Sequence, residues 1–128
     1  MSIQKVLIVD DSKTELMYMS NLLQKNGFAV KTAENADEAF RRLAEEKPDL
    51  ILMDVNLPGM NGLQAMKRLR NTPETRLIPI IALTSNSTPQ NIEAGLNAGF
   101  DGYLTKPIVV SELMKAIQKT LDNITDPI

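Results

Sequence analysis

Several short apolar runs of this 128-residue chain each lead directly into a polar side chain that can bind a cation or a phosphoryl group. In chain order these side chains are Asp10, Asp11, Asp54, Thr84 and Lys106. Carboxylates that share a crevice repel one another unless a cation or a proton intervenes, and a donor set made only of oxygen selects a hard cation such as Mg²⁺. A carboxylate placed to attack, surrounded by a metal, an ammonium and a hydroxyl, suits the transfer of a phosphoryl group.

Five short apolar runs alternate along the chain with segments of helical periodicity. The runs cover residues 6–9, 28–32, 50–53, 78–83 and 103–105. Continuous apolar runs of this length are typical of strands that are covered on both faces, as in a parallel sheet. Right-handed strand–helix–strand crossovers then give an α/β fold, a doubly wound five-stranded parallel sheet with five helices on its two faces.

The helical segments carry recognisable start signals. Ser12 with Glu15, and Asn35 with Glu38, have the spacing of a capping box, in which a cap residue is followed by an acid at the third helical position. The remaining helices are predicted over 62–70, from Pro89 behind an N-cap at Thr88, and over 110–122. Every predicted strand is therefore followed by a predicted helix.

The composition excludes several classes of function. The chain has no cysteine, which excludes a disulfide, a thiolate nucleophile and a Cys-ligated metal. It has no histidine, which excludes a Ser-His-Asp triad, a His-bound metal and a phosphohistidine on this chain. Fourteen Lys and Arg against sixteen Asp and Glu give a net charge of −2, so no broad basic surface for nucleic acid is indicated.

The hydrophobic content of 43% is enough for the core of one domain of this length. We predict that this domain covers residues 1–122 and that residues 123–128 form a tail or the stump of a linker. No apolar stretch is long enough to span a membrane, and no signal peptide precedes the first apolar run. The sequence therefore predicts a cytoplasmic protein without a membrane partner.

The candidate residues are expected to meet at one edge of the sheet. In an open parallel sheet, ligands bind outside the carboxyl ends of the strands, where the strand order reverses. If the first and third strands are neighbours, Asp10, Asp11 and Asp54 converge there, and Lys106 faces them from the far side. A single Asp after a strand is often only a helix cap, and a single Lys is usually solvated. Their joint placement at one edge favours a functional site.

These residues, taken with their neighbours, resemble the receiver domain of bacterial two-component response regulators, the CheY-like family. The resemblance rests on four motifs in order, Val-Asp10-Asp11-Ser, Leu-Met-Asp54-Val-Asn-Leu-Pro-Gly-Met-Asn-Gly, Ala-Leu-Thr84 and Tyr103-Leu-Thr-Lys106-Pro. It covers residues 5–121, nearly the whole chain. It implies the flavodoxin-like fold of that family, with the strand order 2-1-3-4-5 known from its chemotaxis member.

The resemblance also implies a role for each site residue. Asp54 is the phosphoacceptor, which forms a 4-aspartylphosphate with a phosphoryl group from a phosphohistidine on a histidine kinase or a histidine phosphotransfer protein. Asp10, Asp11 and Asp54 bind Mg²⁺ together with the backbone carbonyl of Asn56. Thr84 and Lys106 bind phosphoryl oxygens. The domain is then a phosphoacceptor that assists its own phosphorylation and dephosphorylation, rather than an enzyme that acts on other substrates.

The family resemblance further implies a conformational switch. Thr84 moves toward the phosphoryl group, and Tyr103 swings into the space behind it. The fourth helix, which carries Gly95 in its interior, is expected to respond, so that the face formed by the fourth helix, fifth strand and fifth helix binds a downstream protein target. Asn56 and Asn86 are expected to tune the lifetime of the phosphoryl group. The peptide bond before Pro107 is expected to be cis.

Several alternatives remain open at this point. The chain could be a stand-alone receiver, or a receiver domain excised from a larger regulator or a hybrid histidine kinase. A Mg²⁺-dependent phosphatase that forms an aspartyl phosphate shares the chemistry, but its nucleophile and acid lie two residues apart after the first strand. A flavin-binding electron carrier would need a phosphate-cradling loop where Asp10 and Asp11 stand. A receiver that has lost phosphotransfer would serve as a fixed adaptor.

Overall fold

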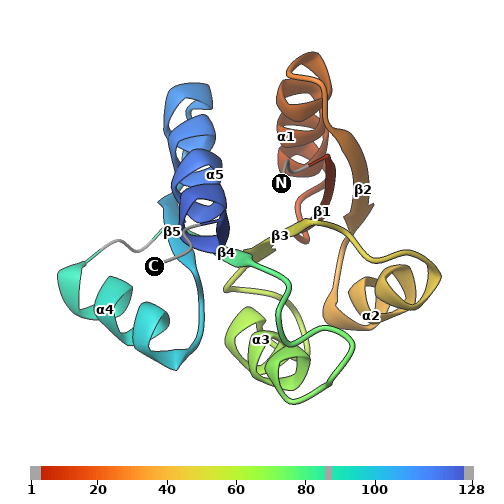
Figure 1. Ribbon diagram of the computed structural model, residues 1–128, viewed down its shortest axis with the longest axis vertical. Coiled ribbons are helices and arrows are strands. Elements are labelled where there is room, and N and C mark those ends of the chain that lie inside the picture. Colours follow the sequence, from red (N-terminus) through yellow and green to blue (C-terminus); the bar gives the residue numbers. More distant parts are fainter. Residues whose placement is uncertain (1–3, 86–87, 126–128) are drawn as a thin grey trace.

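The structure, a computed structural model, describes residues 4–85 and 88–125 (Figure 1). Over these residues strands and helices alternate strictly, as the sequence predicts. The strands are β1 (Lys5–Val9), β2 (Ala29–Ala33), β3 (Leu50–Asp54), β4 (Ile80–Thr84) and β5 (Gly102–Thr105). The helices are α1 (Lys13–Lys25), α2 (Ala36–Glu45), α3 (Gly62–Arg70), α4 (Pro89–Ala98) and α5 (Val110–Thr125).

The strands form one parallel sheet in the order β2-β1-β3-β4-β5, which confirms the predicted doubly wound, CheY-like topology. β1 pairs with both β2 and β3, so the order of the strands reverses at this point. In the register between β1 and β3, Val9 lies opposite Met53. Asp10 and Asp54, one residue further along each strand, are therefore delivered side by side at the carboxyl edge of the sheet.

The helices cover the sheet in two layers. Figure 1 shows α1 and α5 over one face and α2, α3 and α4 over the other. Every residue of β3 and β4 is buried, because these central strands have a helical layer on both sides. The alternating side chains of β3 enter two separate cores, with Ile51 and Met53 in one and Leu50 and Leu52 in the other. This double burial explains the continuous apolar runs of the sequence.

The predicted helix starts are confirmed at Ser12, Asn35 and Thr88, whose side chains each accept a hydrogen bond from the backbone N–H three residues later. Asn61 caps α3. The first residue of α3 is Gly62, which lies so close to the end of β3 that a Cβ atom on it would overlap the carbonyl oxygen of Asp54. A larger residue would force α3 away from the end of the strand that carries the candidate phosphoacceptor.

The C-terminal end of the chain differs from the prediction. α5 continues to Thr125 instead of ending at Asp122, so residues 123–125 of the predicted tail are helical. No Gly or Pro stop signal occurs at this point in the sequence, and the next proline is Pro127. Residues 126–128 lie outside the part of the chain that the structure describes.

The peptide bond between Lys106 and Pro107 is cis, as expected.

Arg70 joins three segments at the edge of the sheet opposite the candidate site. Its guanidinium donates hydrogen bonds to the carbonyl oxygens of Gly99 (2.9 Å) and Ile78 (2.7 Å) and to the carboxylate of Asp101 (2.6 Å). Asp101 in turn accepts a hydrogen bond from the backbone N–H of Ile80, at the start of β4. This arginine therefore ties the end of α3 to the end of α4 and to the start of β4.

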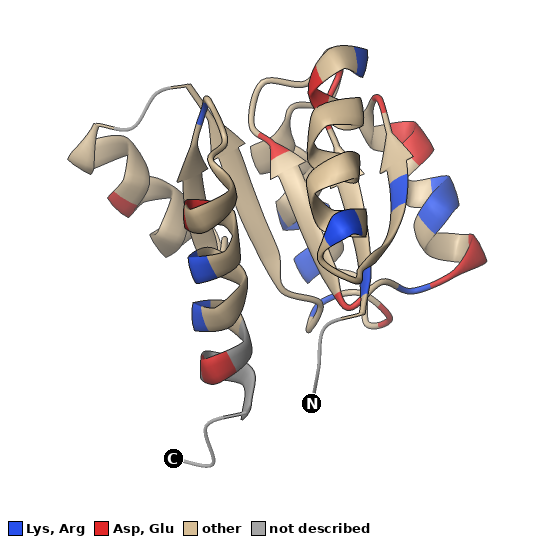
Figure 2. Ribbon diagram, turned by 90° about the horizontal axis from the view of Figure 1, so that it is seen from above, with Lys and Arg blue, Asp and Glu red and all other residues tan. Residues whose placement is uncertain are grey.

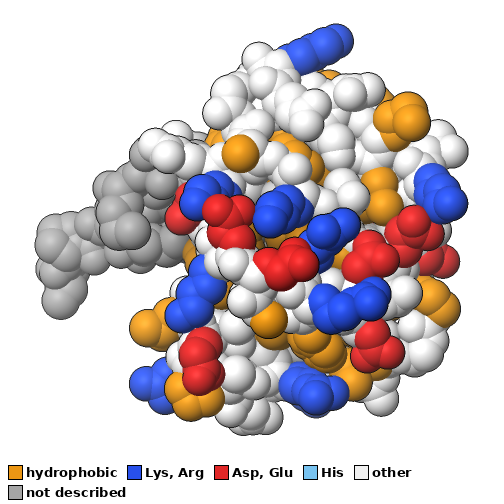
Figure 3. All heavy atoms as spheres, turned by 90° about the vertical axis from the view of Figure 1, so that its right-hand side faces the viewer, with side chains coloured by type: hydrophobic (Ala, Val, Ile, Leu, Met, Phe, Trp, Pro, Cys, Tyr) orange, Lys and Arg blue, Asp and Glu red, His pale blue; other side chains and the backbone are white. Residues whose placement is uncertain are grey.

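The edge strand β2 is protected by charge. Figure 3 shows basic and acidic side chains interspersed on the side of the molecule that carries β2 and α2. Glu46 forms ion pairs there with Lys5 (2.9 Å) and with Lys31 of β2 (3.5 Å). Charged side chains on an edge strand disfavour pairing with a further strand.

None of the helices in the described ranges is long and apolar enough to cross a bilayer.

The Arg70 contacts predict a clear stability effect. Arg70→Met leaves the carbonyl oxygens of Gly99 and Ile78 and the carboxylate of Asp101 without their charged donor, and we expect the free energy of unfolding to fall by about 2–3 kcal/mol. Arg41→Met is the matched control, because its side chain is exposed and its contact with Glu38 is a long ion pair of 4.0 Å. Urea unfolding followed by circular dichroism measures both. Equal losses in the two variants would contradict the assignment.

Candidate functional site

The candidate site lies at the carboxyl edge of the sheet, where the strand order reverses. In Figure 2 acidic segments of the ribbon lie at the arrowhead ends of the central strands. Asp10 directly follows β1, Asp54 is the last residue of β3, and Lys106 directly follows β5. The backbone N–H of Asp10 donates to the carbonyl oxygen of Ala33, and that of Lys106 to Thr84, so parallel pairing extends one residue beyond each strand. The hydrogen bonds of the sheet thus fix the backbone positions of Asp10 and Lys106.

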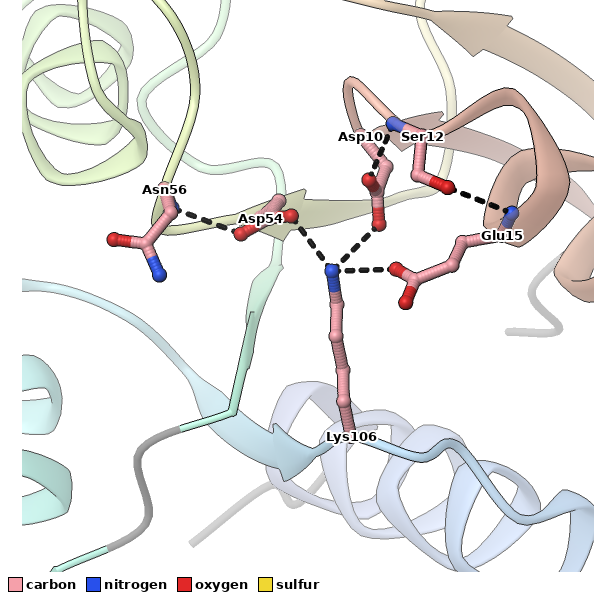
Figure 4. Close-up of polar contacts among 6 residues, drawn as sticks. All are labelled: Asp10, Ser12, Glu15, Asp54, Asn56 and Lys106. Carbon is pink, nitrogen blue, oxygen red and sulfur yellow. Dashed lines mark hydrogen bonds and ion pairs between the residues drawn. The ribbon is translucent and has the colours of Figure 1, made fainter.

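The ammonium of Lys106 lies among three carboxylates (Figure 4). Its Nζ is 2.7 Å from Oδ2 of Asp54 and 2.9 Å from Oδ2 of Asp10. The third carboxylate belongs to Glu15 of α1, whose Oε2 is 2.5 Å from the same nitrogen. β1, β3, β5 and α1 therefore converge on one charged group. The structure brings Asp10, Asp54 and Lys106 together as the sequence predicts.

The two aspartates are held in the same way. Oδ1 of Asp10 accepts a hydrogen bond from the backbone N–H of Ser12 (2.9 Å), and Oδ1 of Asp54 accepts one from Asn56 (2.8 Å). In both cases the carboxylate bonds to its own chain two residues later, a local turn that aspartate favours. One oxygen of each carboxylate is thus fixed to the backbone, and the other faces Lys106.

Burial raises the pKa of both Asp10 and Asp54 above the ordinary value for aspartate. The nearby carboxyl of Glu15 adds to the rise at Asp10, and the charge of Asp10 adds to the rise at Asp54, while Lys106 opposes both. Glu15 is more exposed: burial acts to raise its pKa, but its contacts with Asp10 and Lys106 outweigh this and lower it. Burial likewise acts against the charged form of Lys106, but the three carboxylates raise its pKa, so the ammonium stays charged.

The site offers oxygen ligands for a hard cation. Asp10, Glu15 and Asp54 each present a carboxylate oxygen, and these atoms all lie within 4.8 Å of one another. No imidazole or thiolate ligand can join them, because the chain has no histidine and no cysteine. A cluster with three carboxylates and a single ammonium has an excess of negative charge, and oxygen donors of this kind fit Mg²⁺. The residues present therefore suit a divalent cation.

Two of the predicted metal ligands lie at the rim. The side chain of Asp11 is exposed and is not one of the three carboxylates that meet at Lys106. Asn56 is exposed as well, and its backbone N–H faces Asp54. The ligand roles of Asp11 and of the Asn56 carbonyl thus stay predictions. Asn86, expected to act on the lifetime of the phosphoryl group, lies outside the described residues.

Thr84 and Tyr103 border a pocket beside the acidic cluster. Thr84 is buried at the end of β4, and the pocket of about 300 Å³ next to it is also lined by Asn56 and by Gly95 of α4. The ring of Tyr103 is half-buried and meets Phe100 edge to face, with 6.3 Å between the ring centroids. Among the described residues of α4, burial is confined to Gly95, and a Cβ atom there would overlap the Tyr103 ring.

Glu15 is the site residue that sequence reasoning did not find. Its place three residues after Ser12 was sufficient to explain it as part of a capping box, and the cap itself is present, since Ser12 accepts a hydrogen bond from the backbone N–H of Glu15. A signal was nevertheless available. Side chains on the first turn of a helix point back toward its N-terminus, which here is the edge that carries Asp10.

Comparison with known proteins gives a consistent result. Over residues 6–118 the sequence matches the family described as "Response regulator receiver domain". Protein PilH of Pseudomonas aeruginosa is 39% identical over 117 residues, which are 91% of this chain and 97% of PilH. The phosphate regulon transcriptional regulatory protein PhoB of Escherichia coli is 36% identical over 122 residues, 95% of this chain. The chain spans about half the length of that PhoB, 53%.

Solved structures agree in both fold and sequence. The chemotaxis response regulator CheY4 of Vibrio cholerae superimposes with a TM-score of 0.86 at 34% identity, covering 93% of this chain and 99% of CheY4. The receiver domain of the sensor histidine kinase PA1611 of Pseudomonas aeruginosa superimposes with a TM-score of 0.83 at 32% identity, covering 94% of this chain and 98% of that domain. That structure is described with a magnesium ion coordinated in its active site cleft. The sheet order, the acidic edge and the position of the lysine agree with these matches. This chain belongs to the response regulator receiver domain family of two-component signalling.

Proposed function

We propose that this receiver domain accepts a phosphoryl group on Asp54 from a phosphohistidine on a histidine kinase or a histidine phosphotransfer protein. The observation that carries the proposal is the placement of Asp54 at the end of β3, with Oδ2 2.7 Å from the ammonium of Lys106. The chain has no histidine, so the donor imidazole has to come from another molecule. The raised pKa of Asp54 marks a carboxylate whose charge the fold does not fully compensate.

The residues of the site divide the chemistry among them. A carboxylate oxygen of Asp54 attacks the phosphorus, and the phosphorus–nitrogen bond to the donor imidazole breaks, leaving its electron pair on the nitrogen. Lys106 moves its hydrogen bond from Asp54 to an oxygen of the transferred group. Asp10, Asp11, Asp54 and the carbonyl of Asn56 would hold a Mg²⁺, which would neutralise charge on the transferred oxygens. Thr84, at the end of the neighbouring strand, donates its hydroxyl to another oxygen.

The same residues connect the chemistry to a change of shape. The acyl phosphate places almost two negative charges where the carboxylate carried one. Movement of Thr84 toward this charge opens the space behind it, and the pocket of about 300 Å³ there is bordered by the Tyr103 ring. Tyr103 in turn touches α4 at Gly95. A rotation of the Tyr103 ring would therefore change the packing contact of Gly95, the buried residue of α4.

The face formed by α4, β5 and α5 is the proposed output surface. A groove of about 510 Å³ lies there, with Ile92 and Leu96 of α4 on one side and Lys115 and Lys119 of α5 on the other. Leu96 is 44% exposed. Asp101 and Glu112 line the same groove, so its charge is mixed. An apolar strip with charged side chains of both signs around it suits a protein partner with an apolar anchor and a polar rim, and phosphorylation would shift the population of the binding-competent form.

Labelling with a small phosphodonor tests the proposed chemistry. With acetyl phosphate and Mg²⁺ we expect the intact mass to rise by one phosphoryl group, and Asp54→Asn to abolish the rise, because the amide is not a nucleophile. Asp37→Asn is the control, since Asp37 is exposed on the first turn of α2. Labelling of the Asp54 variant at the wild-type level would refute the assignment. Continuous hydrolysis of a generic phosphate ester at Asp54 would favour the phosphatase alternative instead.

A double-mutant cycle tests the contact between α4 and Tyr103. In the wild type, Gly95→Ala places a methyl group against the ring, and we expect the free energy of unfolding to fall by about 1–3 kcal/mol. In the Tyr103→Ala background the ring is absent, so the same change raises stability by up to about 1 kcal/mol through helix propensity. Chemical denaturation of the four proteins measures both steps. A change of the same sign in both backgrounds would show that the ring does not rest on Gly95.

A further inference from the structure

Three helices of this protein begin with the same sequence pattern, but their third residues do different things. In α3 both bonds of a capping box are formed, because the side chain of Gln64 accepts from the backbone N–H of Asn61 (3.0 Å). In α2 the side chain of Glu38 accepts from the backbone N–H of Glu34 (3.2 Å). Glu15 stands at the same position of α1, and its carboxylate forms no such bond within the described chain.

The reason lies in the turn that precedes α1. A capping box needs the backbone N–H of the cap residue, but the N–H of Ser12 already donates to Oδ1 of Asp10 (2.9 Å). The carboxylate of Glu15 is thereby released from the helix end and turns to the edge of the sheet, where Oε2 lies 2.5 Å from Nζ of Lys106. One residue that the fold would ordinarily use for capping is therefore redirected into the site.

α1 meets the segment after β5 at a second point. Three residues beyond Glu15, the hydroxyl of Tyr18 donates a hydrogen bond to the carbonyl oxygen of Ile108 (2.8 Å). Residues three apart lie on the same face of a helix, so Glu15 and Tyr18 contact Lys106 and Ile108 from one side. The packing of α1 against this segment thus holds the backbone of Glu15 close to the ammonium.

We propose that Glu15 is a positioning residue for Lys106, and that it allows the ammonium and a divalent cation to occupy the site together. This inference rests on the proposed function, in which both groups are needed at Asp54. Lys106 bonds to Oδ2 of Asp10 and to Oδ2 of Asp54, and both carboxylates also offer an oxygen to a cation. When a cation binds these two carboxylates, the ion pair with Glu15 retains the ammonium within reach of Asp54.

The proposal predicts a specific effect of removing the Glu15 carboxylate. Without this carboxylate, Lys106 can bond only to Asp10 and Asp54 and competes directly with the cation for them. The site also loses one negative charge. Both effects weaken cation binding, whereas neither removes a group that touches the phosphoryl donor. We therefore expect a shift in the Mg²⁺ concentration that the protein requires, with little loss of the labelling rate at saturating Mg²⁺.

Glu15→Gln tests the proposal, with Glu38→Gln as the matched control at the equivalent position of α2. Both variants retain their helix caps, because Ser12 and Asn35 bond to backbone N–H groups. Calorimetric titration with Mg²⁺ alone, without a phosphodonor, is expected to give about 10-fold weaker binding for Glu15→Gln. For Glu38→Gln we expect a dissociation constant within about twofold of wild type, since Glu38 is half-buried on α2 and is not one of the carboxylates that meet at Lys106.

A spectroscopic measurement separates this role from a merely structural one. In wild type with Mg²⁺, the ¹⁵N signal of the Lys106 ammonium is expected to persist, because the ion pair with Glu15 protects it from exchange. In Glu15→Gln with Mg²⁺ it is expected to broaden beyond detection. Unchanged Mg²⁺ affinity in Glu15→Gln, or equal losses in both variants, would overturn the inference. Absent labelling of wild-type Asp54 would instead refute the proposed function, because the Mg²⁺ titration is read independently.

Discussion

The structure depends on one electrostatic constraint, the placement of a single ammonium among three carboxylates at the edge of a parallel sheet. Lys106 reaches Asp10, Asp54 and Glu15 at once, and the contacts measure 2.9, 2.7 and 2.5 Å. One positive charge does not balance three carboxylates, and oxygen donors with this excess of negative charge suit a divalent cation. The doubly wound topology serves this arrangement, because it brings the ends of β1 and β3 together and lets β5 supply the lysine.

Such a site costs stability, and the rest of the molecule offsets it. Burial raises the pKa of Asp10 and Asp54, which means that burial disfavours their charged forms in the folded state. Two apolar cores on the opposite faces of the sheet, together with the Arg70 contacts at the far edge, supply the compensation. The buried charges of the site thus lie at the edge where the chemistry is proposed, and Arg70 and Asp101 hydrogen-bond the opposite edge.

Much of this arrangement could be predicted from the sequence. The strands followed from continuous apolar runs, and Asp10, Asp54 and Lys106 followed from their position after those runs. Glu15 could not be assigned in this way, because its local pattern is the same as that of Glu38. What separates the two is the use of the Ser12 N–H by Asp10, a contact that capping rules do not anticipate. The end of α5 was placed too early for a related reason, since nothing in the local sequence stops the helix.

The attachment of α4 gives this helix the character of a lever. Arg70 holds the carbonyl oxygen of Gly99 at its C-terminal end, and the buried Gly95 lies against the Tyr103 ring. At a rise of 1.5 Å per residue, Gly95 lies about 6 Å from this fulcrum and Pro89 about 15 Å from it. A small sideways push at Gly95 is therefore multiplied roughly 2.5-fold at Pro89. In the proposed switch, a sub-ångström motion of the ring would thus become a larger displacement at the N-terminal end of α4.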